Sequence, residues 1–335
     1  MTDAYDIIKN PPPMGYVDCP KARADVASAF AAAGVDISGK SVQGEFQRQI
    51  AQGNCYINLH DYEADFISRQ MQTLVKSHRN IIGGVLQPFS QRTGICNGCS
   101  HSTAPWLSWC YRFVNSGDCA VPREVTFLGG YFLGRQGLSG DSGAYPNYTA
   151  KGYHDIGVLP VDCGGKYDFA NMTPEQQESI CEALRDNPVL LKEWVAAMHP
   201  LKSRVFSPQD GNLVADCLAS GYAVTFGSSA QINNAPNPGG VSSLYVLRDA
   251  WGRPAGHETC GSGVYTYRGE VFGMKTESWY GANYYPGGAF PEHRITVQTD
   301  AGPKLLYPGQ GAFKLSDWMS YKPECWAYAW PGSAA

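Results

Sequence analysis

The sequence contains no run of about 18 apolar residues, the length that an α-helix needs to cross a membrane. Basic residues are not in excess either, because 26 lysines and arginines stand against 30 aspartates and glutamates. Domains that bind nucleic acid carry a basic surplus, so we expect neither a membrane nor a nucleic acid as partner. The N-terminal stretch MTDAYDIIKNPPPMGYV also lacks the basic start and apolar centre of a signal peptide. We therefore expect a cytoplasmic protein, or one assembled inside a cell into a larger particle.

The cysteines lack the regular spacing of a disulfide framework. There are 11 of them, an odd number, and a chain of 335 residues can bury a core without disulfide staples. We therefore expect mostly free thiols. The length suggests one large domain or two modest ones.

The apolar pattern and the turn residues predict helices early in the chain and strands late. A proline at the start and a glycine at the end bound the segment 20–34, and the segments 41–53 and 60–80 follow similar rules. Strands are predicted at 222–229 and from Val241 onward. This order predicts an α+β fold with a helical half and a sheet half. Further helices are predicted over 173–187, 187–199 and 211–221.

Three cysteines gather in QRTGICNGCSHSTAPWLSWC, from Gln91 to Cys110. The plainest interpretation is that they are small apolar fillers of the core. A zinc site would need a fourth thiolate from Cys119, but eight residues separate Cys110 from Cys119, whereas closed zinc sites favour two to four. A redox dithiol would need a parallel βαβ setting, which the pattern here does not predict. We therefore expect no bound metal and no cofactor.

A nucleophilic thiol is the remaining chemistry. A thiol attacks well as a thiolate, which a helix N-terminus or an imidazole stabilises. Turn residues at Gly94 and at Asn97-Gly98 place a helix start close to the cysteine pair. Gln91 could donate its amide to an oxyanion, and far downstream His257 is followed by Glu277.

These residues occur in an order that resembles papain-like cysteine peptidases, particularly their bacterial and phage-borne relatives. The resemblance covers about residues 85–300 and rests on a short series of motifs. They are Gln91 with Gly94 and a cysteine, DSGAYP at 141–146, Gly256-His257, and ESWYG at 277–281. The family's usual asparagine is here Glu277, and a carboxylate can also hold the tautomer of a histidine.

The resemblance implies a papain-like fold with a cleft between its helical and sheet halves, and hydrolysis of peptide or amide bonds in a peptide or protein substrate. In this interpretation His257 is the base and Glu277 orients it, while Gln91 supplies the oxyanion hole. Gly143 and Ala144 would pair with the substrate backbone. Trp279 would cover the contact between the histidine and its acceptor. A phage-type setting would make the particle a virion.

The nucleophile is either Cys96 or Cys99. The family has its glutamine six residues and a glycine two residues before the nucleophile. Gln91 and Gly94 stand five and two residues before Cys96, whereas Gln91 is eight residues before Cys99. The spacing favours Cys96. Cys99 stays the alternative because papain has a similar Cys-x-x-Cys pair in which the second cysteine attacks.

Two interpretations of different class therefore follow. The first is an active thiol hydrolase, and the second is a papain-fold binding or structural module without activity. We predict a helical N-terminal extension over residues 1–80 and a catalytic domain over 81–335. The extension is expected to pack permanently on the catalytic domain through Phe66, Met71 and Leu74. Three further histidines fit the catalytic role less well, namely His101, His154 and His293.

Overall fold

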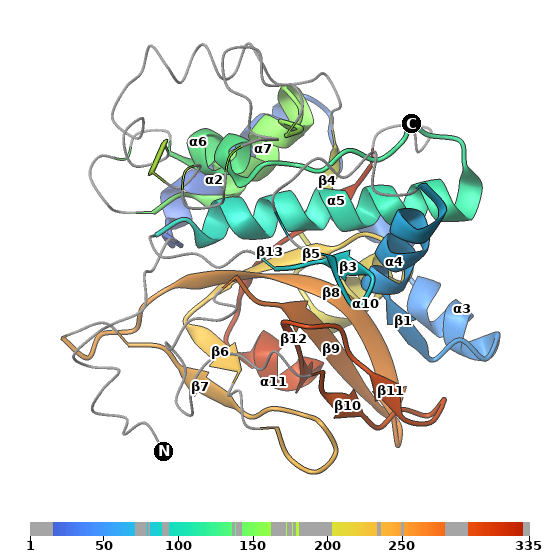
Figure 1. Cartoon of the computed structure of the whole chain (residues 1–335). Coiled ribbons are helices and arrows are strands. Elements are labelled where there is room, and N and C mark those ends of the chain that lie inside the picture. Colours follow the sequence, from blue (N-terminus) through green and yellow to red (C-terminus); the bar gives the residue numbers. More distant parts are fainter. Residues whose placement is uncertain are drawn as a thin grey trace.

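The computed structural model describes residues 16–70, 79, 81–88, 94–135, 138, 143–161, 172, 176, 179–180, 203–232, 236–248, 251–278 and 294–330. Figure 1 shows a layer of helices lying along one side of a strongly twisted antiparallel sheet. The predicted α+β class is therefore confirmed. Within the described residues, no helix is both long enough and apolar enough to span a bilayer.

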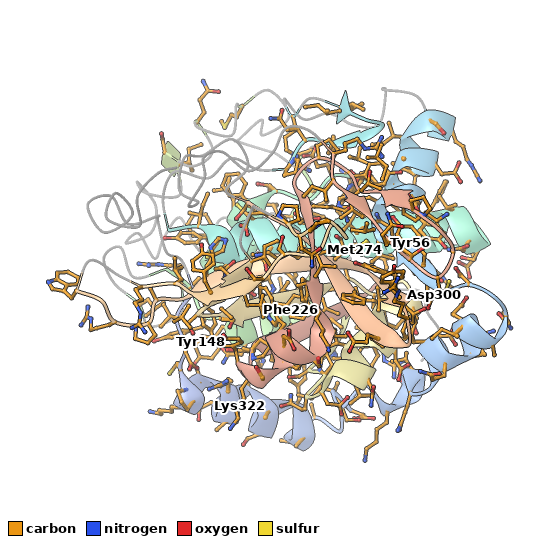
Figure 2. All side chains as sticks on the ribbon, turned by 90° about the horizontal axis from the view of Figure 1, so that it is seen from below. Tyr56, Tyr148, Phe226, Met274, Asp300 and Lys322 are labelled. Atoms are coloured by element: carbon orange, nitrogen blue, oxygen red, sulfur yellow. The ribbon has the colours of Figure 1, made fainter. Side chains whose placement is uncertain are left out.

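Among the described residues the main sheet has seven strands, and the pairings between them are antiparallel. Six of them lie in the order β12 (Gln310–Lys314), β9 (Glu270–Thr276), β8 (His257–Tyr267), β5 (Val224–Ser228), β13 (Glu324–Ala329) and β4 (Arg204–Phe206). The seventh, β1 (Tyr56–Asn58), lies off this path and pairs with β8. Phe226 of β5 and Met274 of β9 are fully buried and lie inside the molecule, whereas Lys322 lies at its periphery (Figure 2). The central strand β8 is buried along most of its length, so it joins the cores of both halves.

Helix α5 (Cys96–Ser116) is the long helix that lies against this sheet. Its buried side chains include Trp106, Leu107 and Trp109, which are part of the main hydrophobic core. It ends at Gly117, whose φ of 65° is the left-handed conformation that glycine adopts without strain. Helices α6 (Phe127–Gly134) and α7 (Pro146–Asp155) cover its other side.

The N-terminal part is helical as predicted but also contributes a strand. Helix α2 (Pro20–Ala32) begins with its proline at the first helical position, and α3 (Glu45–Ala51) and α4 (Leu59–Gln70) follow. Between them β1 (Tyr56–Asn58) pairs with β8, a strand that the helical periodicity did not reveal. A three-residue strand has too short a pattern to detect, and its pairing with β8 decides its conformation.

Several contacts attach this part to the rest of the molecule. Phe66 is fully buried, as predicted, whereas Met71 and Leu74 lie outside the described residues. The Asp216 carboxylate accepts hydrogen bonds from the backbone of Gly44 and Phe46, at 2.8 and 2.9 Å. The boundary between an extension and a catalytic domain stays a prediction.

The remaining elements are short. Helix α10 (Gly211–Ala219) and strand β5 agree with the predicted helix and strand, and a 3-10 helix, η1, spans Lys40–Val42. Helices predicted within 173–199 lie outside the described residues apart from isolated positions. The others are β2 (Ile81–Ile82), β3 (Val85–Leu86), β6 (Ala230–Ile232), β7 (Leu244–Val246), β10 (Thr296–Val297), β11 (Lys304–Leu305) and α11 (Leu315–Ser320).

Candidate active site

Cys96 is the first residue of α5, as expected for a nucleophile at a helix start. Its sulfur accepts a hydrogen bond from the backbone N–H of Glu258, at 3.3 Å. Glu258 directly follows His257 in β8, so the contact brings the sulfur beside the residue next to the predicted base. The positive end of the helix dipole at Cys96 stabilises a thiolate there.

His257 and Glu277 form a hydrogen-bonded pair in the interior. The ring Nε2 lies 2.6 Å from Oε1 of Glu277, and neither side chain is exposed to solvent. Since Nε2 is committed to the carboxylate, Nδ1 is the nitrogen that could exchange a proton with a thiol. The backbone N–H of Ser278 also donates to Oε1 of Glu277, at 2.9 Å.

The negative charge of Glu277 is balanced by a buried lysine. Nζ of Lys275 lies 2.9 Å from Oε2 of Glu277 and 2.7 Å from Oε1 of Gln231. Residues two apart in a strand share a face, so the sequence Lys-Thr-Glu directs Lys275 and Glu277 to the same side. The ammonium also lies 5.0 Å from the centroid of the Trp318 ring.

Burial controls the ionisation of this group. It lowers the pKa of His257 below its usual value, although the Glu277 carboxylate opposes the shift and Lys275 adds to it. Burial likewise lowers the pKa of Lys275, again against the effect of Glu277. A lowered histidine pKa favours the neutral imidazole, the form that can accept a proton.

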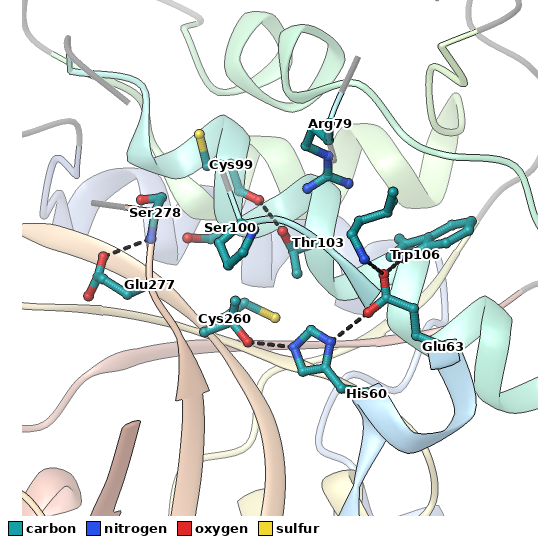
Figure 3. Close-up of a pocket in the computed structure, with 13 residues that line it drawn as sticks. His60, Glu63, Arg79, Cys99, Ser100, Thr103, Trp106, Cys260, Glu277 and Ser278 are labelled. Atoms are coloured by element: carbon teal, nitrogen blue, oxygen red, sulfur yellow. Dashed lines mark hydrogen bonds and ion pairs between the residues drawn. The ribbon is translucent and has the colours of Figure 1, made fainter. Parts of the chain in front are cut away.

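Cys99 lies about one helical turn beyond Cys96 and lines a small, partly open cavity. The space measures about 20 Å³, enough for a single water molecule. Cys99 and Ser278 lie at one end of it and the pair His60–Glu63 at the other (Figure 3). Cys260, also buried, lines the same space, and burial raises its thiol pKa.

The cavity contains a second buried histidine–carboxylate pair that the sequence analysis missed. Nδ1 of His60 lies 2.5 Å from Glu63, and Nε2 lies 2.7 Å from the Thr276 hydroxyl. The other Glu63 oxygen accepts from the indole of Trp106 and the backbone of Leu86. Both oxygens of Glu63 and both ring nitrogens of His60 are thus engaged, which fits a structural role. A clue was available, because His60 and Glu63 are three residues apart in a predicted helix.

The other predicted site residues have the following positions. Gly143, at a φ of 74°, and the buried Ala144 are separated from α7 by Tyr145. The Ala144 carbonyl accepts from the backbone of Val17 at 3.2 Å. Gln91 and Trp279 lie outside the described residues. Their predicted roles, like those of the residues above, stay predictions.

The four-thiolate zinc alternative is incompatible with the structure. Cys96 and Cys110 lie on one continuous helix, 14 residues apart. At 1.5 Å per residue their Cα atoms are separated by about 21 Å. Thiolates so far apart cannot bind the same ion.

Two of the three histidines that fit the catalytic role less well, His101 and His154, lie within the described residues. His101 is fully buried on α5, where Nε2 lies 2.6 Å from Glu258 and Nδ1 contacts the hydroxyl of Tyr328. Both nitrogens are engaged, so His101 connects α5 to β8 and β13. His154 lies near the surface beside Asp155, and His293 lies outside the described residues.

Comparison with solved structures finds papain-like cysteine proteases. Xylellain from Xylella fastidiosa is 15% identical, with a TM-score of 0.42 over 72% of this chain and 82% of that one. The ragweed allergen Amb a 11, in its proform, is 9% identical, with a TM-score of 0.43 over 82% and 64%. Procathepsin L 3 of Tenebrio molitor is 11% identical, with a TM-score of 0.38 over 93% and 94%. The chain is thus structurally similar to these proteases at low identity, a likeness that concerns the fold alone.

Comparisons by sequence give nothing further. No protein-family model matches the chain. No curated protein matches it.

Proposed function

We propose that this protein is a thiol hydrolase that cleaves peptide or amide bonds, with Cys96 as nucleophile and His257 as its base. One observation carries the proposal. The Cys96 sulfur lies at a helix N-terminus against the backbone of Glu258, while the adjacent His257 is held by Glu277 through Nε2. This arrangement supports the proposed roles of Cys96 as nucleophile, His257 as base and Glu277 as orienting acceptor.

The reaction follows from these roles. The Cys96 proton passes to Nδ1 of His257 while the sulfur bonds to the substrate carbonyl carbon. The C–N bond then breaks, and His257 returns the proton to the leaving amine. Water next attacks the thioester with His257 as base, which releases the carboxylic acid and restores the thiol. The helix N-terminus and the Gln91 amide would stabilise the oxyanion that forms in each half of the reaction.

Glu277 with Lys275 takes the place of a neutral acceptor. A lone buried carboxylate would be costly, and it would also raise the proton affinity of His257. The ammonium of Lys275 offsets the charge, so the pair is neutral overall while Glu277 still accepts from Nε2. The pair can therefore hold the orientation of the His257 ring while Nδ1 stays able to accept a proton.

The test compares two single variants on a panel of fluorogenic peptide amides. Cys96→Ala should abolish turnover with the fold intact, whereas Cys99→Ala should keep substantial activity. Far- and near-ultraviolet circular dichroism controls for folding. If Cys99→Ala alone loses activity, Cys99 is the nucleophile. If both variants keep the activity of the parent protein, a thiol mechanism with either cysteine is contradicted.

The inactive module remains the second candidate, and burial favours it. The side chains of Cys96 and His257 have no exposed surface, so a substrate cannot reach them in the conformation described. If the wild-type chain cleaves nothing on the panel, and its cysteines react uniformly with thiol reagents, the module is the better account.

A further inference from the structure

The residue after Cys96 is hydrogen-bonded to the residue after His257. Nδ2 of Asn97, on α5, donates to Oε2 of Glu258, on β8, at 2.9 Å, and neither side chain has exposed surface. The backbone N–H of Glu258 also donates to the Cys96 sulfur, at 3.3 Å. Two contacts therefore join the start of α5 to the start of β8, and we call them together the clasp.

Every polar atom of the Asn97 and Glu258 side chains has a partner. Oδ1 of Asn97 lies 2.9 Å from the Thr149 hydroxyl, on α7. Oε1 of Glu258 lies 2.6 Å from Nε2 of His101, which is about one turn beyond Asn97 on α5. An ionised carboxylate can only accept, so His101 donates through Nε2, and Nδ1 of the neutral ring accepts from the Tyr328 hydroxyl. The clasp is thus anchored to α7 and β13 as well.

Stability alone does not account for a carboxylate at this position. Replacing a buried charged network by packed apolar side chains is often neutral or stabilising. A fully satisfied polar network instead fixes the position and orientation of its members, because each hydrogen bond requires a narrow range of geometry. The clasp therefore sets how the start of α5 lies relative to β8, and proton transfer between Cys96 and His257 depends on that geometry.

We propose that Asn97 and Glu258 are positioning residues of the hydrolase, which hold the Cys96 sulfur in place for its base. The inference rests on the proposed function. A displacement of about 1 Å between reacting groups can lower a rate about a hundredfold. The N–H of Glu258 also stabilises the Cys96 thiolate, since a hydrogen bond to the charged form favours that form. Loss of the clasp therefore affects both the chemical step and the ionisation of the thiol.

The kinetic test reverses the direction of the hydrogen bond. Asn97→Asp sets a second carboxylate against Glu258 and should lower kcat about a hundredfold, with KM nearly unchanged because substrate contacts remain. Glu258→Gln alone should have a small effect, because the Asn97 amide can rotate to accept from the glutamine and donate to Thr149. The double variant Asn97→Asp/Glu258→Gln gives every polar group a partner again. It should therefore recover most of the kcat that Asn97→Asp loses.

Asn212→Asp is the matched control for this substitution. Asn212 is exposed and, like Asn97, is the second residue of its helix, here α10. The control should leave kcat and KM unchanged. Urea unfolding of each variant gives the conditions under which it is fully folded, and kcat is measured there, so that loss of folding is not counted as loss of positioning. Parent kcat in Asn97→Asp, or a double variant no more active than Asn97→Asp, would overturn the proposal.

An absorbance titration separates this inference from the proposed function. The ultraviolet band of the Cys96 thiolate is the difference between each full-length protein and the same protein carrying Cys96→Ala, followed as the pH rises. Asn97→Leu, or Asn97→Ala if the leucine variant does not fold, removes the amide without adding charge. It should shift the midpoint of Cys96 ionisation to higher pH, whereas Asn212→Leu should not.

That shift supports the clasp even if the chain hydrolyses nothing. Hydrolysis without the shift overturns the clasp and leaves the proposed function standing. A midpoint that Asn97→Leu and Asn97→Ala leave unchanged, or a Cys96 band that never appears, overturns the clasp whether or not the chain hydrolyses a substrate.

Discussion

At the scale of single residues, the pair Lys275–Glu277 decides how His257 is held. Both side chains are fully buried and joined at 2.9 Å. Removing one partner of such a pair leaves an uncompensated charge in the interior, whereas removing both leaves none. The pair therefore behaves as one unit, and its energetics can be measured as a unit.

We predict that Lys275→Met and Glu277→Gln each lower the free energy of unfolding by about 3–5 kcal/mol. The double variant should be more stable than either single variant, because a glutamine still accepts from Nε2 of His257 and no lone charge remains. Urea unfolding of the four proteins completes a double-mutant cycle. Additive losses would mean that the two groups do not act together.

Glu324 makes stability depend on pH with a definite sign. Burial raises its folded pKa to about 8, above the unfolded value of 4.5, so the folded state retains a proton that the unfolded state has lost. The contribution of this group to stability is therefore lost as pH rises from about 4.5 to about 8, by up to about 1.4 kcal/mol per unit.

The measurement compares urea unfolding of the parent and of Glu324→Gln at pH 5, 6.5 and 8. Other groups titrate equally in both proteins, so the difference between them isolates Glu324. We expect the free energy of unfolding of Glu324→Gln to rise relative to that of the parent as the pH increases. A difference that stays constant over this range would show that Glu324 is ionised in the folded state.

At the scale of elements, close packing fixes the start of α5. Gly98 lies against α6, where an added Cβ would be 2.4 Å from the Phe127 carbonyl oxygen and 3.0 Å from the Cβ of Tyr131. The helix can approach α6 this closely only with glycine at that position. Because Gly98 is two residues after Cys96, this contact also helps to position the sulfur.

Gly98→Ala should therefore destabilise the protein by about 1–3 kcal/mol through overpacking. Alanine is favoured over glycine in a helix by about 1 kcal/mol, so helix propensity alone predicts the opposite sign. Gly211→Ala is a matched control, since the nearest atom to its Cβ would be Met319 Cγ at 3.5 Å, an ordinary contact. A stabilised Gly98→Ala variant would contradict the packing described at the start of α5.

Elements with strong local signals could be predicted from the sequence. Pro20 and the turn after Ala32 bound α2, and the predicted strand at 222–229 agrees with β5. The pairing of β1 with β8 could not be predicted, because three residues carry no measurable period. For the site, turn residues at Gly94 and at Asn97-Gly98 indicated a helix start close to the cysteine pair. The structure places that start at Cys96, so Asn97 and Gly98 lie within the helix rather than in a turn before it. The ion pair between Glu277 and Lys275 could not be predicted, because the sequence does not show that Lys275 is buried rather than exposed.

At the scale of the whole molecule, distant segments meet around β8. The N-terminal segment contributes Tyr16, α5 contributes Cys96, and β9 with the residues after it contributes Glu277. Contacts between residues more than a hundred positions apart depend on the complete fold. The order of motifs in the sequence suggested Cys96, His257 and Glu277 as site residues. It did not indicate that Tyr16 lies beside Gly256.

The most direct test of the account is to find which cysteine the site activates. The full-length chain and its His257→Ala variant would be treated with a substoichiometric peptidyl epoxide, and the adduct located by peptide mass spectrometry. The account predicts one dominant adduct, on Cys96, which is lost in His257→Ala while the fold is kept. Dominant labelling of Cys99, or labelling of Cys96 that does not depend on His257, would contradict it.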